Sequence, residues 1–219
     1  IREYLCSVAM EGLDIPSTQA LAIVGSETDV YREHVESGAI LTRVAKSHIR
    51  FGHFELFASR GQAAEVKKLA DFTIEKYFPE LKGMNPYTEF FKEVVRLTAI
   101  MIARWQVQGF AHGVMNSDNM SILGLTIDYG PFGFMETYDP AFVCNHSDYQ
   151  GRYSFERQPA VALWNLERLA GSLRNLIDES ALKESLEQYQ VFLIKEYSVL
   201  MRRKFGLNEI FDKDNELIS

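Results

Sequence analysis

The residues best suited to carry chemistry lie in two short stretches near the middle of the 219-residue chain. The first stretch, 112–119, reads His-Gly-Val-Met-Asn-Ser-Asp-Asn and so ends in Asp118 and Asn119. The second is Asp128, which comes nine residues after Asn119 and is followed by Tyr-Gly. Carboxylate and amide oxygens bind hard divalent cations, and an ionised carboxylate can also accept a proton. These residues therefore indicate a metal site with a base beside it.

Two short apolar segments, 120–123 and 125–127, separate Asn119 from Asp128 and predict a tight hairpin around Gly124. The amide oxygen and the carboxylate then arrive from opposite ends of one hairpin and can share a cation. A Mg²⁺ ion bound to nucleotide phosphates usually takes only one or two protein groups of this kind. We therefore expect Asn119 and Asp128 to be metal ligands.

The same pieces also occur in ordinary turns, because Asp-Asn and Asp-Tyr-Gly are common turn sequences. Their combination favours a site, and protein kinases use a similar set: a loop Asp for the substrate hydroxyl, then a loop Asn and a later Asp for metal. Kinase-like small-molecule phosphotransferases place the first Asp directly after His-Gly. Here Val114 holds that place and cannot accept a proton, so Asp118 is the nearest replacement.

The sequence around these residues resembles the selenoprotein O family of protein adenylyltransferases. The resemblance begins at Ile1 and extends at least to Leu169. It is carried by the string HGVMNSDNMSILGLTIDYGPFGF from residue 112 and by the later strings CNHSD, GRY, QP and WNL. The resemblance implies an α+β, mostly helical, protein-kinase-like fold. Residues 1–46 would be the remainder of the small lobe. Residues 47–219 would be the helical large lobe, with a catalytic loop, a metal-binding hairpin and a stretch like an activation segment.

The same resemblance implies an activity. Members of this family bind ATP in a flipped orientation and transfer AMP, rather than phosphate, to Ser, Thr or Tyr hydroxyls of proteins. ATP would be the substrate and Mg²⁺ or Mn²⁺ the cofactor. Asp118 resembles the family's proton acceptor, Asn119 and Asp128 resemble its metal ligands, and Asp128 would also lie near the nucleotide.

Three charged residues in the first quarter of the chain complete the implied site. Arg43 and Arg50 resemble the two arginines that bind phosphates, and Glu3 resembles the helix glutamate that pairs with a nucleotide-binding lysine. Guanidinium groups match phosphate oxygens and stay charged at any relevant pH. A structural salt bridge is the alternative for either arginine. The family's glycine-rich loop and lysine would lie upstream of Ile1, so we expect this chain to be part of a longer protein and to be inactive by itself.

Two other functions are open at this point. Asp118 could serve as a displaced base in a kinase-like phosphotransferase. The chain could also be a non-catalytic nucleotide-binding pseudokinase module that binds partners through residues 129–158. Among weaker candidates, His112 is expected to shape the loop through a backbone hydrogen bond, His146 and Asp148 make a poor zinc site, and Trp164 is expected in the core.

The elements that must position these residues follow from hydrophobic periodicity. A helix over 1–11 and strands over 19–24 and 39–45 open the chain, with a polar, turn-rich stretch over 26–38 between the strands. Helical patterns then cover 47–57, 62–78, 87–108, 159–173 and 180–205. Residues 129–158 show no period, and an irregular stretch of that length is usually functional.

Composition narrows the class of protein further. The hydrophobic fraction is 47% and the charged fraction 24%, which are globular values. The net charge of −7 argues against nucleic-acid binding. The most apolar stretch, 97–103, is too short to cross a membrane. Two cysteines cannot form a disulfide framework, so a reducing compartment is expected. The resemblance to the selenoprotein O family implies the cytoplasm in a bacterium and the mitochondrion in a eukaryote.

Overall fold

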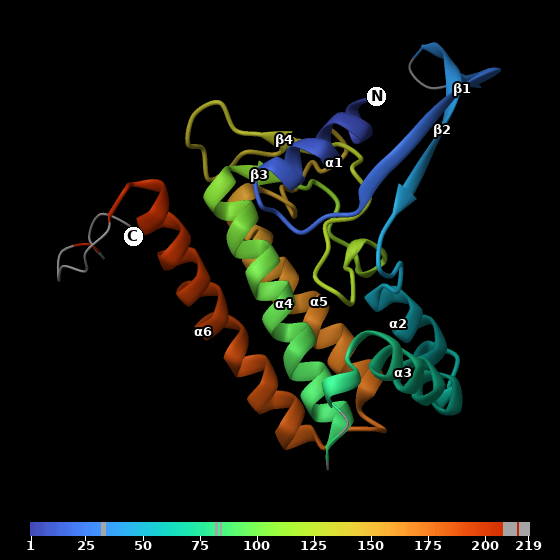
Figure 1. Cartoon of the computed structure of the whole chain (residues 1–219), viewed down its shortest axis with the longest axis vertical. Coiled ribbons are helices and arrows are strands. Elements are labelled where there is room, and N and C mark those ends of the chain that lie inside the picture. The colour runs from blue at the N-terminus through green and yellow to red at the C-terminus, as the bar shows by residue number, and fades with distance from the viewer. Residues whose placement is uncertain (32–33, 82, 84, 208–213, 215–219) are drawn as a thin grey trace.

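A computed structural model describes the chain except for residues 32–33, 82, 84, 208–213 and 215–219. A helix and a long β-hairpin occupy one end of the molecule, and helices together with the loop-rich stretch 109–157 form the rest (Figure 1). The elements, in order, are α1 (Arg2–Gly12), β1 (Gln19–Tyr31), β2 (Val35–Val44), α2 (Phe51–Ser59), α3 (Ala63–Tyr77), η1 (Pro79–Leu81), α4 (Pro86–Gln108), β3 (Phe110–Ala111), η2 (Ser117–Asn119), β4 (Gly133–Phe134), η3 (Phe155–Arg157), α5 (Gln158–Leu173) and α6 (Glu179–Lys204). The predicted α+β, mostly helical class is confirmed.

Helix α4 is the centre of the helical part. It begins with Pro86, whose missing N–H costs nothing in the first turn of a helix, and it ends at Gly109 in the left-handed conformation. Its buried side chains are spread around much of the helix, because α6 packs along it and α5 contacts it as well. The loop that follows Gly109 therefore starts from a rigid, buried support.

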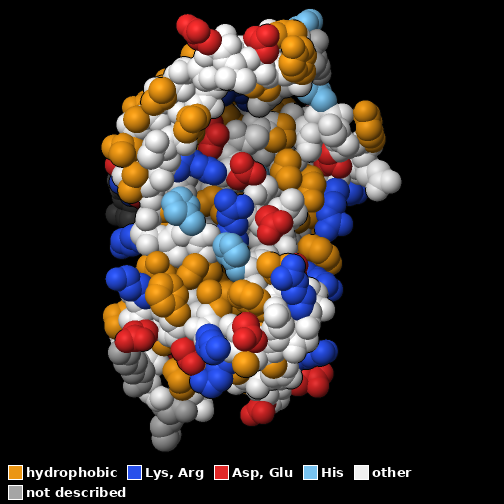
Figure 2. All heavy atoms as spheres, turned by 90° about the vertical axis from the view of Figure 1, so that its right-hand side faces the viewer, with side chains coloured by type: hydrophobic (Ala, Val, Ile, Leu, Met, Phe, Trp, Pro, Cys, Tyr) orange, Lys and Arg blue, Asp and Glu red, His pale blue; other side chains and the backbone are white. Residues whose placement is uncertain are grey.

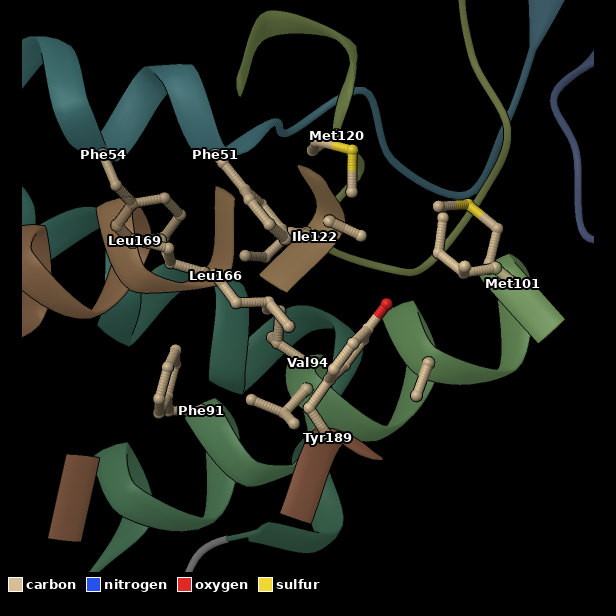
Figure 3. Close-up of a cluster of buried hydrophobic side chains, with 14 of the residues drawn as sticks. Phe51, Phe54, Phe91, Val94, Met101, Met120, Ile122, Leu166, Leu169 and Tyr189 are labelled. Atoms are coloured by element: carbon tan, nitrogen blue, oxygen red, sulfur yellow. The ribbon is translucent and has the colours of Figure 1, made fainter. Parts of the chain in front are cut away.

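The core gathers apolar side chains from four helices and from the turn after η2 (Figure 3). Phe51 and Phe54 reach in from α2, and Leu166 and Leu169 reach in from α5; all four are fully buried. Burying each such side chain stabilises the fold by about 1.5–3 kcal/mol. Because α2 and α5 share this core, the surface between them is fixed in shape.

The β1–β2 hairpin is longer than the sequence predicts. The strands pair antiparallel from Gln19 opposite Val44 to Tyr31 opposite Val35, so most of the stretch 26–38 is strand and the prediction of a turn-rich segment there was wrong. Most side chains of the hairpin are exposed, so polar residues are tolerated on both faces and the apolar alternation that marks a half-buried strand is missing.

Several apolar side chains of this hairpin lie on the surface. Leu21 of β1 and Ile40 of β2 are 67% and 68% exposed. Figure 2, which views the molecule from the side of the hairpin, α2 and α3, shows hydrophobic side chains on the surface at the upper end. Charged and histidine side chains gather in the middle of the same face (Figure 2).

The predicted hairpin around Gly124 is only partly right. Met120 and Thr126 form a single antiparallel bridge, and the turn between them closes with the Gly124 amide donating to the Ser121 carbonyl at 3.1 Å. The first arm pairs mainly with another segment: the amide of Phe51 donates to the carbonyl of Met120 at 2.9 Å. The turn is therefore tied to the start of α2.

The predicted helices are otherwise confirmed, with shifts of a residue or two at most ends. The exception is α2, which begins at Phe51 rather than near Ser47. The Ser47 hydroxyl accepts from the amide of Ile49 at 3.1 Å, which makes a local turn instead of a helix cap. Within the described part of the chain, no helix is long and apolar enough to cross a membrane.

Trp105 joins α4 to the segment before Asp128, and its contribution can be measured. The Trp105 Nε1–H donates to the Thr126 hydroxyl at 2.9 Å, and both side chains are buried. We predict that Trp105→Phe and Thr126→Val each lower the free energy of unfolding by about 1–3 kcal/mol, because each removes this buried hydrogen bond. In urea unfolding, the free energy of unfolding of the double variant should fall by less than the sum of the losses in the two single variants. Strict additivity would show that this hydrogen bond contributes nothing.

Candidate active site

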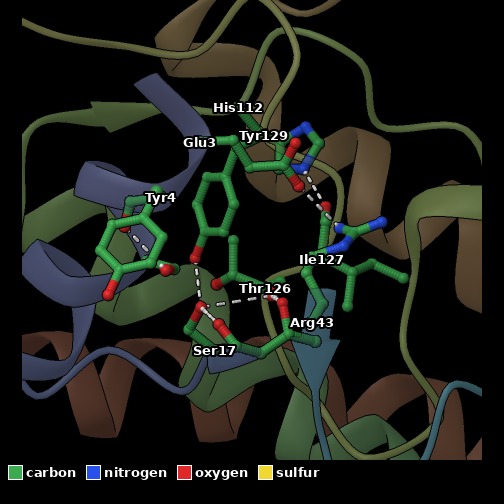
Figure 4. Close-up of polar contacts among 10 residues, drawn as sticks. Glu3, Tyr4, Ser17, Arg43, His112, Thr126, Ile127 and Tyr129 are labelled. Carbon is green, nitrogen blue, oxygen red and sulfur yellow. Dashed lines mark hydrogen bonds and ion pairs between the residues drawn. The ribbon is translucent and has the colours of Figure 1, made fainter. Parts of the chain in front are cut away.

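His112 organises the loop that carries the candidate site residues. Its ring is 1% exposed and stacks on Trp105, with ring centres 5.3 Å apart. Its Nε2 lies 2.8 Å from the Ile127 carbonyl, as Figure 4 shows, and its Nδ1 lies 3.4 Å from the amide of Val114. The expectation that His112 shapes the loop through backbone hydrogen bonds is confirmed. One ring thereby joins the start of the loop to the residue before Asp128.

The two contacts of His112 define its protonation state. A carbonyl can only accept and an amide can only donate, so Nε2 must carry the hydrogen and Nδ1 must be bare. Burial lowers the pKa of His112 below its ordinary value of 6.5, which also favours the neutral ring. A neutral imidazole that is buried and engaged at both nitrogens is a structural group and not a base.

Helix α5 holds the same loop from the other side. The Gln158 side chain accepts from the His112 amide and donates to the Phe110 carbonyl, both at 2.9 Å. About two turns further along the helix, the Asn165 side chain donates to the Met115 carbonyl at 2.8 Å. Sequence reasoning assigned no role to either residue. The available signal was two amide side chains, seven positions apart, among the mostly apolar residues of the buried face of the helix.

Asn119 and Asp128 fit the predicted metal site chemically. Asn119 is 5% exposed, and its Nδ2 donates to the Val114 carbonyl at 3.0 Å, so its Oδ1 is left to accept or to bind a cation. The half-buried Asp128 carboxylate makes no hydrogen bond or ion pair with the described residues. Two hard oxygen donors suit Mg²⁺ or Mn²⁺ held jointly with phosphates and water. The convergence of these two side chains on one ion stays a prediction.

The backbone at Asp128 is in an unusual conformation. Its φ angle is +65°, in the left-handed region that residues other than glycine rarely adopt. Asp and Asn tolerate this region better than most residues. Among the described residues, no group of three or more His, Cys, Asp or Glu side chains could hold a metal ion.

Asp118 lies on η2 and is exposed, in contrast to its buried neighbour Asn119. It lines a pocket of about 660 Å³ between α2, η2 and α5. Gly52, in the first turn of α2, lets the carboxylate lie where it does: a Cβ on Gly52 would stand 2.0 Å from the Asp118 Oδ1. Next to it, the Ser117 hydroxyl donates to the Glu55 carboxylate at 2.8 Å. Helix α2 therefore shapes the surroundings of the candidate base.

Arg43 and Glu3 form an ion pair with each other. The Arg43 Nη1 is 3.1 Å from the Glu3 Oε1 (Figure 4), and neither of these buried atoms makes a hydrogen bond. Glu3 was expected to pair with an upstream lysine and Arg43 with phosphate. From β2, Arg43 points toward Ile127, the residue before Asp128 (Figure 4). The guanidinium is thus on the Asp128 side of the molecule.

The residues around this ion pair connect α1, β1 and the segment 126–129. Tyr129 is buried, its hydroxyl contacts the Ser17 hydroxyl, and burial raises its pKa. Arg50 lies directly before α2, where it forms a backbone bridge with Ser121, two residues after Asn119. All the predicted site residues therefore belong to segments that contact one another or contact the loop 112–119. The roles assigned to them stay predictions.

Two weaker expectations have clear outcomes. Trp164 was expected in the core, but it is 42% exposed, and the guanidinium of Arg152 lies 4.7 Å from its ring centre. The Asp148 carboxylate accepts from the amides of Arg152 and Tyr153 at 2.9 and 2.7 Å. Asp148 therefore stabilises a turn, which agrees with the view that His146 and Asp148 are a poor zinc site.

A comparison with protein families gives the class to which this fold and site belong. The family model "Protein adenylyltransferase SelO" matches residues 1–219, and the chain belongs to this family. Two similar relatives are both named "Protein nucleotidyltransferase YdiU". The one from Aliivibrio salmonicida (strain LFI1238) is 57% identical over 99% of this chain and 45% of its own length. The one from Enterobacter sp. (strain 638) is 56% identical over 100% of this chain and 46% of its own length. The chain thus spans about half the length of the curated relatives it matches.

The neutral state of His112 predicts an acid-sensitive fold. The unfolded chain takes up a proton on this residue near pH 6.5, and the folded chain binds it only at lower pH. The contribution of His112 to the free energy of unfolding should therefore be complete above pH 6.5. Below pH 6.5 the free energy of unfolding should fall by up to about 1.4 kcal/mol per pH unit. Urea unfolding at pH 7.5 and 5.5 measures this effect.

His112→Gln provides the comparison, because an amide has no proton to gain in this range. The variant should be less stable than the wild type at pH 7.5, since it loses the stack on Trp105. Its stability should nevertheless change less between pH 7.5 and 5.5. An equal change in both proteins would mean that other groups cause the acid sensitivity.

Proposed function

We propose that the whole protein is an AMP transferase that modifies Ser, Thr or Tyr hydroxyls of proteins, with ATP as its substrate. The observation that carries this proposal is the placement of the only exposed acid in the loop. Val114 holds the position of a kinase base, while Asp118, the neighbour of Asn119 in the chain, lines an open pocket. Membership of the SelO family and the names of the relatives support the same activity.

The proposed chemistry is a single displacement at the α-phosphorus of ATP. The acceptor oxygen forms a bond to that phosphorus, the bond from the phosphorus to the pyrophosphate oxygen breaks, and pyrophosphate leaves. The hydroxyl proton passes to the Asp118 carboxylate. General-base assistance of this kind contributes about 10²–10⁴ in rate.

Asn119 and Asp128 are the residues proposed to hold Mg²⁺ or Mn²⁺. When bound, the ion would neutralise charge on the phosphates and so stabilise the charge that develops on the leaving group. The hydrogen bond from Asn119 to Val114 fixes the amide, so its oxygen has one orientation. Among the described residues the Asp128 carboxylate has no hydrogen-bond or ion-pair partner, so its oxygens can bind a cation.

Arg43 and Arg50 are proposed to contact the phosphates of the flipped nucleotide. Arg43 is held by Glu3 near the residues that precede Asp128, and Arg50 forms a backbone bridge with Ser121. The order of a helix with a partner glutamate, a hairpin, a buried helix, a loop and a later Asp supports a protein-kinase-like arrangement of residues 1–46 and 47–219. The bacterial relatives favour the cytoplasm as the compartment.

The identity of the transferred group tests the proposed function. The full-length protein should transfer label to protein from α-labelled ATP and not from γ-labelled ATP. Asp118→Asn, which keeps the shape but removes the base, should lower transfer by about 10²–10⁴ and leave ATP affinity unchanged. Asp29→Asn, at an exposed carboxylate of β1, is the matched control and should have no effect.

Other results would favour the alternatives. Transfer of the γ-phosphate without AMP would establish a phosphotransferase with Asp118 as a displaced base. Binding of ATP with no transfer of either label, in wild type and variant alike, would establish a nucleotide-binding module.

The proposed metal ligand at position 128 needs a substitution that suits its backbone. Asn tolerates φ of +65° as Asp does, so Asp128→Asn removes the charge without adding the strain that Ala would bring. We predict that this variant binds ATP in the presence of metal at least about tenfold more weakly than the wild type, because a charge-assisted contact contributes about 1.5–3 kcal/mol. Thermal stability without ligands should be unchanged. Titration calorimetry with and without Mg²⁺ measures the effect, and equal ATP affinity in both proteins would rule out Asp128 as a ligand.

A further inference from the structure

The pocket beside Asp118 is built from two helices and one short 3₁₀ turn. Gly52 and Leu56 come from α2, Ser117 and Asp118 from η2, and Arg168 and Gly171 from α5. Its volume, about 660 Å³, is within the range of pockets that bind ligands. Because Phe51, Phe54, Leu166 and Leu169 bury the opposite faces of α2 and α5 in one core, the walls of the pocket are rigid.

Asp118 is the one predicted site residue that lines this pocket. Asn119, Asp128, Arg43 and Arg50 do not line it. The turn η2 therefore presents its acid to the pocket and keeps its amide buried behind. A group that enters the pocket reaches the candidate base without passing the predicted metal ligands.

The charges of the lining argue against a nucleotide as the occupant. Glu55, Asp118 and Glu167 place three carboxylates around the pocket. Of the two guanidinium groups there, that of Arg168 already lies 3.6 Å from the Glu55 carboxylate. A triphosphate would meet repulsion in such a place, whereas a polypeptide can use the mixture of hydroxyl, carboxylate and apolar surface.

We propose that this pocket, here termed the acceptor pocket, binds the segment of a protein substrate that carries the acceptor hydroxyl. The proposal rests on the proposed function, and it assigns the two reactants to different sides of η2. The acceptor hydroxyl approaches Asp118 from the acceptor pocket, and the nucleotide is on the side of Asp128. The Ser117–Glu55 hydrogen bond and the close approach of Gly52 hold Asp118 in place between the two proposed reactants.

Gly171 offers a way to fill the acceptor pocket without touching Asp118. It lies on the exposed side of α5, and a Cβ added there would meet no atom within 4 Å. A leucine at this position projects into open space in the pocket and improves helix propensity. Ala160, exposed on the same helix and outside the pocket, gives the matched control.

The test uses the full-length protein and short synthetic peptides with a central Ser, Thr or Tyr. Gly171→Leu should weaken peptide binding, measured by fluorescence anisotropy, by about tenfold or more. It should raise KM for peptide AMP transfer to the same degree. ATP affinity should be unchanged, and Gly171→Ala should show a smaller effect in the same direction. Ala160→Leu should leave all of these values unchanged, and thermal unfolding verifies that each variant folds.

Three outcomes would overturn the acceptor pocket. They are peptide binding that Gly171→Leu does not weaken, a loss of ATP affinity in that variant, and no peptide binding by the wild type. A different result would separate the two proposals. If peptides bind the wild type, bind Gly171→Leu more weakly and receive no AMP from the wild type, the acceptor pocket is supported and only the proposed function is contradicted.

Discussion

A buried neutral imidazole holds the candidate site in shape. The loop 112–119 has almost no regular secondary structure, so its backbone groups need partners from elsewhere. The His112 ring accepts from the Val114 amide inside the loop and donates to the Ile127 carbonyl beyond it, and the ring is itself held by the stack on Trp105 of the central helix. A ring in that position couples the rigid core to both ends of the site, because Val114 precedes Asn119 and Ile127 precedes Asp128. The free-energy cost of burying the imidazole is offset because the ring makes hydrogen bonds with backbone groups.

Helix α5 has the complementary role. Its apolar face completes the core through Leu166 and Leu169, and two amide side chains on that same face bond to the loop. Gln158 engages both a donor and an acceptor of the backbone, so it fixes the chain at Phe110 and His112. The same helix forms one wall of the acceptor pocket on its outer side. Support of the loop and the shape of the pocket thus depend on a single element.

The helices were predictable because each buries one stripe of apolar side chains and so leaves a periodic signal. The full length of the β1–β2 hairpin was not, since its exposed strands lack that signal and only the first part of β1 and the last part of β2 could be predicted. For the candidate site, Asp118, Asn119 and Asp128 could be proposed from residue types and spacing, and their roles stay predictions. Gly52 could not, because its importance arises from the approach of an Asp that is 66 positions away in the chain. The Glu3–Arg43 pair is also a property of the folded arrangement of α1 and β2.

The exposed hairpin has a practical consequence for anyone who produces this 219-residue chain. In the described sheet, β1 and β2 pair only with each other, so each presents an outer edge of unpaired backbone groups. The two strands also carry surface leucine and isoleucine side chains, and an exposed apolar edge strand is a template for pairing with another strand. Charged substitutions at Leu21 and Ile40 would oppose such edge-to-edge association while leaving the helical part, with its pocket, as it is. The hairpin is therefore the place to engineer for solubility, and the helices are the place to study chemistry.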